Sequence, residues 1–208
     1  MGDNSPETLK AINNLAISYG IRGNYRVAAT LQKKVLAVRK KILGDNHPET
    51  LKALNNLAVS YRKSGRYDKA VPLQEEIFNL NKKNFGYNHP ETLKALNNLA
   101  ISFVNLKLYD KALPLQEKIL NLSMELLGNE HPDTIAAMNN LAWSLTSVGR
   151  HIDALNLMEK ALPLYKKILG DEHPDTLGDI DTLIHVLNAL GRNDEVTALQ
   201  KKLSHTVS

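Results

Sequence analysis

Residues 47–58 read His-Pro-Glu-Thr-Leu-Lys-Ala-Leu-Asn-Asn-Leu-Ala, and residues 89–100 repeat these twelve residues without a change. The similarity extends along the chain at the same interval of 42. It includes five prolines, Pro6, Pro48, Pro90, Pro132 and Pro174, and four asparagine pairs, Asn13-Asn14, Asn55-Asn56, Asn97-Asn98 and Asn139-Asn140. Similarity at a fixed period of this length is the sequence signature of a repeat architecture.

Each repeat reads as two helices. In the second repeat, apolar residues fall on one helical face at Leu51, Leu54, Leu57, Ala58 and Tyr61, at the spacing of an amphipathic helix. Pro48 suits the first position of a helix, and Gly65 supplies the left-handed residue that ends it. A second apolar stripe follows at Ala70, Leu73, Ile77 and Leu80. We expect helices over about 48–63 and 67–84, with copies every 42 residues.

The expected fold class is therefore all-α, with ten antiparallel helices. A lone helix pair cannot bury both of its apolar stripes, so neighbouring pairs must stack. No stretch resembles a linker, which predicts one solenoid domain over residues 1–208. Its five repeats would span about 5–44, 47–86, 89–128, 131–170 and 173–208.

Composition limits the classes of protein that remain. The net charge is +4, and aromatic residues are 5% of the chain. The charge excess is small and aromatics are sparse, so we do not expect a nucleic-acid partner. No apolar run is long enough to span a membrane, and no membrane partner is expected. The chain has no cysteine and no signal-peptide pattern, which predicts a cytoplasmic protein.

The repeated positions resemble the tetratricopeptide signature, which Leu54, Leu57, Ala58, Tyr61, Gly65, Ala70 and Ile77 match in spacing. The 42-residue period and the His-Pro-Glu-Thr and Leu-Asn-Asn-Leu-Ala segments resemble kinesin light chain repeats specifically. They are also similar to the repeat arms of NB-ARC proteins. The resemblance implies a right-handed solenoid whose first helices line a concave groove.

The residues on that groove side are the candidate peptide-binding site. They combine lysines, doubled asparagines and one apolar position: Lys10, Asn13, Asn14 and Ile17; Lys52, Asn55, Asn56, Val59 and Lys63; Lys94, Asn97, Asn98 and Ile101; Asn139, Asn140 and Trp143. Amides can bind the backbone of an extended peptide through their donors and acceptors. The lysines would form a positive edge for acidic side chains.

Each of these features has a second interpretation. The asparagines could instead bond one repeat to the next, and the lysines could be an ordinary solvated face. Trp143 could contact a partner, or it could cover a neighbouring helix.

No catalytic or metal constellation is present in the sequence. It contains no phosphate-binding glycine loop, no H-E-x-x-H and no G-x-S-x-G motif. His47, His89, His131 and His173 precede successive prolines, and helix packing would set them too far apart to share a metal. We expect them to act as caps or to pack in the loops. We predict no enzyme, no metal and no cofactor.

Two functions remain. The first is a scaffold that binds an extended, acidic segment of a protein partner, as a cargo adaptor of the kinesin light chain type would. The second is a structural or self-associating arm of a larger sensor or assembly. End-to-end self-association would be favoured because no polar helix covers Leu199 and Leu203.

Overall fold

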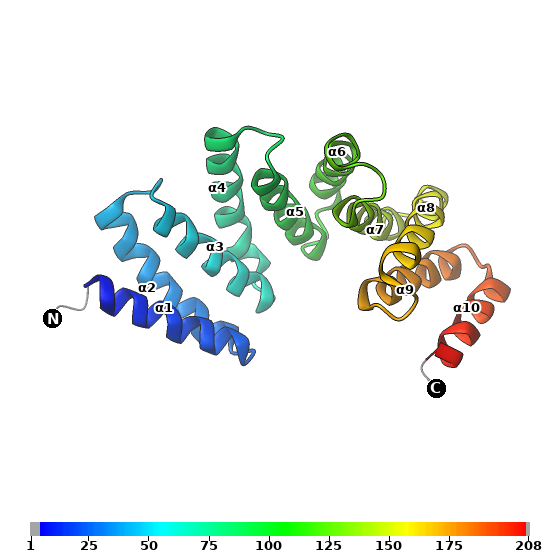
Figure 1. Ribbon diagram of the computed structural model, residues 1–208, viewed down its shortest axis with the longest axis horizontal. Helices are drawn as coiled ribbons and strands as arrows, with labels where there is room; N and C mark the ends of the chain where they lie inside the picture. The colour runs from blue at the N-terminus through cyan, green and yellow to red at the C-terminus, as the bar shows by residue number, and fades with distance from the viewer. Residues whose placement is uncertain (1–4, 207–208) are drawn as a thin grey trace. The chain divides into compact units, whose positions relative to one another are not determined.

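The computed structural model describes residues 5–206, with side chains through residue 201, so Leu203 lies outside the described side chains. These residues contain ten α-helices and no strand. The first helices of the repeats are α1 (Pro6–Ile21), α3 (Pro48–Lys63), α5 (Pro90–Asn105), α7 (Pro132–Ser147) and α9 (Pro174–Ala189). The second helices are α2 (Tyr25–Leu43), α4 (Tyr67–Phe85), α6 (Tyr109–Leu127), α8 (His151–Leu169) and α10 (Asn193–Thr206). The all-α prediction is confirmed (Figure 1).

The helix starts follow from the His-Pro segment. The His47 ring accepts a hydrogen bond at Nδ1 from the backbone N–H of Glu49, over 3.1 Å. His89, His131 and His173 cap α5, α7 and α9 in the same way. The predicted capping role is therefore confirmed. No group of residues that could hold a metal ion occurs among the described residues.

The turns between the paired helices need a left-handed residue, and Gly65 supplies it with φ of +73°. The third repeat has Lys107 at this position, and it adopts the same conformation with φ of +59°. The turn geometry of the repeat therefore overrides the steric preference of a non-glycine residue.

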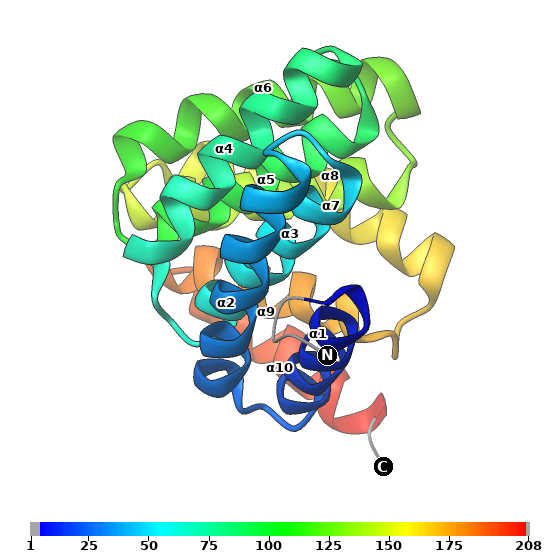
Figure 2. The same ribbon diagram turned by 90° about the vertical axis from the view of Figure 1, so that its left-hand side faces the viewer.

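The helices fall into two compact units, Met1–Lys107 and Leu108–Ser208. In the first unit α1 packs on α2, α2 on α3, α3 on α4 and α4 on α5, and Figure 2 shows α1 beside α2. Its core includes Val35, Leu54 and Leu57, with Leu73 and Ile77 packed against them. The apolar faces predicted from the sequence are thus the buried ones.

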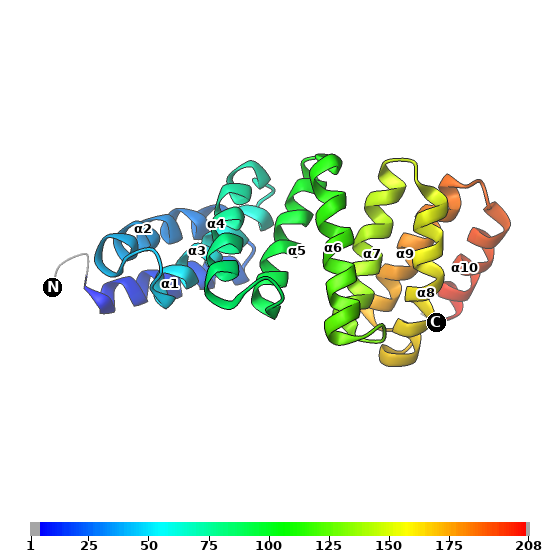
Figure 3. The same cartoon turned by 90° about the horizontal axis from the view of Figure 1, so that it is seen from above.

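The second unit follows the same rule for α6 to α10, which Figure 3 shows in green to red. Here α7 also contacts α9 directly. Ile135, Met158 and Val186 are fully buried at 0% exposure. That all five repeats form one right-handed solenoid domain stays a prediction.

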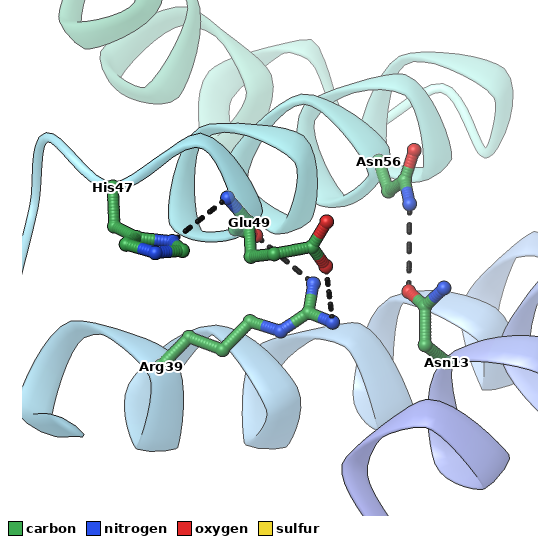
Figure 4. A network of polar contacts seen from close by, with 5 residues as sticks. All are labelled: Asn13, Arg39, His47, Glu49 and Asn56. Atoms are coloured by element: carbon green, nitrogen blue, oxygen red, sulfur yellow. Dashed lines mark hydrogen bonds and ion pairs between the residues drawn. The ribbon is translucent and has the colours of Figure 1, made fainter. Parts of the chain in front are cut away.

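Polar side chains from the second helices tie successive repeats of the first unit together. Arg39 of α2 donates to the Glu49 carbonyl over 2.9 Å and pairs with the Glu49 carboxylate over 2.8 Å (Figure 4). Asn81, 42 positions later, donates to the Glu91 carbonyl over 3.0 Å. Main-chain groups at the starts of α3 and α5 are thereby anchored.

None of the helices within residues 5–206 is both long and apolar enough to cross a membrane.

Candidate binding site on the first helices

The repeated stretch places equivalent lysines on α1, α3 and α5 of the first unit. Lys10, Lys52 and Lys94 are all exposed. None of them forms a salt bridge in the described part of the chain. No direct ion pair therefore holds these ammonium groups to a carboxylate.

A pocket of about 190 Å³ lies between α3, α4 and α5. Lys52 and Asn55 line it from α3, Lys94 and Asn98 line it from α5, and Ile77 of α4 contributes an apolar surface. The remaining lining residues are Leu51, Asn81, Glu91 and Ala95. Four of the predicted site residues, from two successive repeats, are thus brought together in one place.

The chemistry of this pocket combines charge, amides and an apolar surface. Two ammonium groups and the Glu91 carboxylate leave one net positive charge at its edge. Asn55 is exposed and Asn98 is half-buried, so both amides can reach a bound group. The pocket can hold a carboxylate beside a backbone amide and a small apolar contact.

A narrower pocket of about 10 Å³ adjoins the first and shares Asn55, Ile77 and Asn98 with it. Val59 and Gln74 also line it. The Gln74 side chain is buried, and its Oε1 has no hydrogen-bond partner. A residue with an unpartnered buried acceptor therefore lies beneath the predicted binding surface.

The asparagines of the first and second repeats are bonded to each other. Asn56 donates from Nδ2 to Oδ1 of Asn13 over 3.4 Å (Figure 4). One repeat later, Asn98 and Asn55 occupy the equivalent positions and share no hydrogen bond among the described residues. Inter-repeat bonding thus occurs at the first pair of repeats, and an open pocket occurs at the second.

The other candidates of the first unit do not line this pocket. Lys63 lines a separate pocket of about 310 Å³ with Ser64 and the turn from Gly23 to Val27. Asn14 and Ile17 are exposed on α1, and Asn97 and Ile101 are half-buried on α5. Lys63 is therefore not grouped with Lys52 and Lys94.

In the second unit Trp143 stacks on His185, with ring centroids 4.8 Å apart and planes 27° from parallel. The two residues are 42 positions apart, so they are equivalent positions of successive repeats. Trp143 remains 45% exposed. One face of the indole is covered by the next repeat, and the rest offers surface for a partner.

Asn139 and Asn140 of α7 are half-buried and engaged differently. The main-chain carbonyl of Asn140 accepts hydrogen bonds from Gln116 Nε2 over 3.1 Å and from Ser144 Oγ over 3.1 Å. The Asn139 side chain lies beside Asp179 of α9. The Asn139 side chain therefore meets a neighbouring helix, whereas the bonds of Asn140 are made by its main chain.

Asp179 is fully buried, and neither carboxylate oxygen has a hydrogen-bond partner of good geometry, although the Asn139 amide lies beside the group. It stands where the three preceding repeats have the buried alanines Ala53, Ala95 and Ala137. Burial first, and then repulsion by Asp175, raise its pKa from 3.8 to about 7, and the Asn139 amide opposes the shift. Burial and the nearby Asp179 also raise the pKa of the Tyr165 hydroxyl.

Sequence reasoning missed Gln74, Asp179 and His185 as parts of these surfaces. Comparing equivalent positions of the repeats, 42 residues apart, would have pointed to two of them. Asp179 falls in an alanine position, and His185 falls in the position of Trp143. Nothing in the register indicated that Gln74 would lie beneath a pocket.

Comparison with known proteins agrees with this architecture. A family model described as tetratricopeptide repeat matches residues 7–83, 49–105 and 91–167. The chain belongs to the tetratricopeptide repeat family, which makes it a protein–protein interaction scaffold. No curated protein matches the sequence.

Solved structures give a finer likeness. The TPR-like repeats of a Podosopora anserina protein assigned as a kinesin light chain are 26% identical, with a TM-score of 0.81 over 99% of this chain and 96% of that one. A second structure of these repeats is 27% identical, with a TM-score of 0.79 over 97% and 95% of the two chains. A Rap protein complexed with Competence and Sporulation Factor shares the fold at 13% identity, with a TM-score of 0.71 over 92% and 51% of the chains.

Proposed function

We propose that the chain is an adaptor of the kinesin light chain type, which binds an extended, acidic segment of a protein partner. The observation that carries the proposal is the pocket between α3 and α5, where Lys52 and Lys94 stand beside Asn55 and Asn98. Trp143 would add an aromatic contact in the second unit.

The pocket fits an extended segment because its lysines, amides and apolar side chains can each contact a different kind of group on that segment. The two exposed ammonium groups attract a carboxylate, and each amide offers both a donor and an acceptor to main-chain groups. Ile77 and Val59 supply apolar contact. The Rap structure supports the proposal only in that an array with this fold is known in a complex with a bound factor.

Affinity should be moderate and sensitive to salt. An extended segment is ordered on binding, which lowers the net free energy of association. We expect Kd values on the order of micromolar. Exposed charges are screened over about 8 Å at physiological ionic strength, so the lysine contribution should fall as salt rises.

Panning a random twelve-residue peptide library on the wild-type protein tests the proposal. The enriched peptides should be rich in Asp and Glu. The best of them should bind Lys52→Glu with Lys94→Glu at least tenfold more weakly. The control is Lys33→Glu with Lys34→Glu on α2, which changes the net charge equally at exposed positions outside the pocket. Enrichment of no peptide, or equal losses in both double variants, would reject this function.

A further inference from the structure

Gln74 presents a polar atom that the fold leaves without a partner. Its side chain is 3% exposed, its Oε1 accepts no hydrogen bond, and it lines the narrow pocket with Asn55 and Asn98. Buried polar atoms in folded proteins are nearly always hydrogen-bonded. Gln74 Oε1 is therefore free to accept a hydrogen bond from a donor outside the chain.

The fold does not use an amide at this position in every repeat, although Gln116 of α6, the equivalent residue 42 positions later, donates from Nε2 to the Asn140 main-chain carbonyl. Met158 of α8 is the equivalent residue 84 positions later, and it is fully buried at 0% exposure. A methionine of similar volume thus fills this position in the same chain. The polar end of Gln74 is therefore available for a function other than packing.

The size of the narrow pocket limits what can reach Oε1. A volume of about 10 Å³ is about that of one water-sized group. An N–H group held at the surface of a bound segment fits this space, and a whole side chain does not. The wider pocket beside it, which Lys52 and Lys94 line, has room for the rest of the bound residue that carries this N–H group.

We infer that Gln74 is a specificity-determining residue, whose Oε1 accepts a hydrogen bond from an N–H of the segment that binds between α3 and α5. The inference rests on the proposed function, because it assigns a group of that bound segment. A single Asp or Glu of the segment satisfies both Gln74 and the lysines. Its carboxylate reaches Lys52 or Lys94, and its main-chain N–H donates to Gln74 Oε1. The pocket therefore selects for an N–H donor as well as for negative charge.

Gln32 provides a matched control in the same chain. It is the equivalent residue of α2, it is 4% exposed, and its Oε1 is also unpartnered. The asparagines at the corresponding positions of the first two repeats, Asn13 and Asn56, are hydrogen-bonded to each other. At Gln74 the equivalent pair, Asn55 and Asn98, lines an open pocket instead. A glutamine-to-methionine substitution can thus be compared where the asparagines are bonded to each other and where they line a pocket.

The experiment measures the Kd of the best library peptide for wild type, Gln74→Met and Gln32→Met by fluorescence anisotropy. We expect Gln74→Met to weaken binding about tenfold, as for loss of one hydrogen bond, and Gln32→Met to stay within about twofold. Single N-methylation along the peptide should reveal one position that weakens binding to wild type but not to Gln74→Met. If alanine replacement of an Asn, Gln or Lys in the peptide has that effect instead, the donor is a side-chain N–H.

Peptide binding by Gln74→Met that equals wild type overturns the inference and leaves the proposed function standing. Enrichment of no peptide, or insensitivity to Lys52→Glu with Lys94→Glu, rejects the proposed function itself. Thermal unfolding checks that both methionine variants are folded. If Gln74→Met does not fold, the ¹⁵N resonance of the Gln74 side chain in wild type gives the answer. Its shift on addition of the peptide supports the inference, and its constancy contradicts it.

Discussion

The Asn56 side chain of α3 donates a hydrogen bond to Asn13 of α1 over a distance of 3.4 Å. This distance is long for an N–H···O bond, so the bond should contribute little to stability. The equivalent pair one repeat later, Asn98 and Asn55, faces a pocket. The inter-repeat bonding interpretation therefore applies to the first pair of repeats, and peptide binding by the second pair stays a prediction.

Asn56→Ala should lower the free energy of unfolding by about 0.5–1 kcal/mol, because it removes one weak hydrogen bond. Asn98→Ala should change it by no more than about 0.5 kcal/mol, as at other surface sites. Urea unfolding of both variants measures the difference. A larger loss for Asn98→Ala would show that this asparagine is also structural.

Leu57→Ala should cost about 2–5 kcal/mol, the range for buried leucines, because Leu57 is 3% exposed in the core of the first unit. His89→Ala removes a cap and a stacking contact with Phe85, and should cost about 1 kcal/mol. Denaturant midpoints compare the two changes. A histidine change as costly as the leucine change would mean that the loop does more than cap α5.

Lys107→Gly should stabilise the chain by about 0.5–1 kcal/mol. Lys107 has a φ of +59°, which costs a non-glycine residue about 1–2 kcal/mol, and the greater unfolded-state entropy of glycine offsets part of the gain. Gly65→Ala is the reverse change at the equivalent position, and should destabilise. Thermal unfolding checks both signs, and a lower melting temperature for Lys107→Gly would contradict the strain.

Asp179→Ala should stabilise the chain at pH 8 and have little effect at pH 4. The folded-state pKa of Asp179 is raised from 3.8 to about 7, so the folded chain holds this proton more tightly than the unfolded chain does. The contribution of protonated Asp179 to the free energy of unfolding is fully present below about pH 4 and is lost as pH rises through about 7.

Each pKa unit corresponds to about 1.4 kcal/mol, so the gain at pH 8 should be a few kcal/mol. The alanine matches Ala53, Ala95 and Ala137 at this position. Thermal unfolding of both proteins across this pH range provides the measurement. An equal effect of the substitution at both ends of the range would show that the carboxylate titrates normally.

The repeat register made the helices predictable because each boundary depends on local chemistry. Pro48 begins a helix and Gly65 ends one, and the observed α3 runs from Pro48 to Lys63 as expected. His47 was predictable as a cap for the same reason. Local signals of this kind recur every 42 residues, which is why the prediction transferred to all five repeats.

The candidate site was predictable only in part, because it depends on how neighbouring helices meet. The register placed Lys52 and Lys94 on the same side, but it could not show that Asn13 would bond to Asn56 while Asn55 remained free. The environment of Asp179 depends on Asn139 and Tyr165 from two other helices. Such relationships are set by packing, and sequence spacing does not determine them.

The most direct test of the account is the affinity of the best library peptide for Asn55→Ala with Asn98→Ala, measured at 0.15 M and about 0.5 M salt. The account predicts at least tenfold weaker binding at both salt concentrations, because neutral amides are not screened as charges are, and a melting temperature within about 2 °C of wild type. Unchanged affinity, or a loss of affinity accompanied by a fall in melting temperature of several degrees, would contradict it.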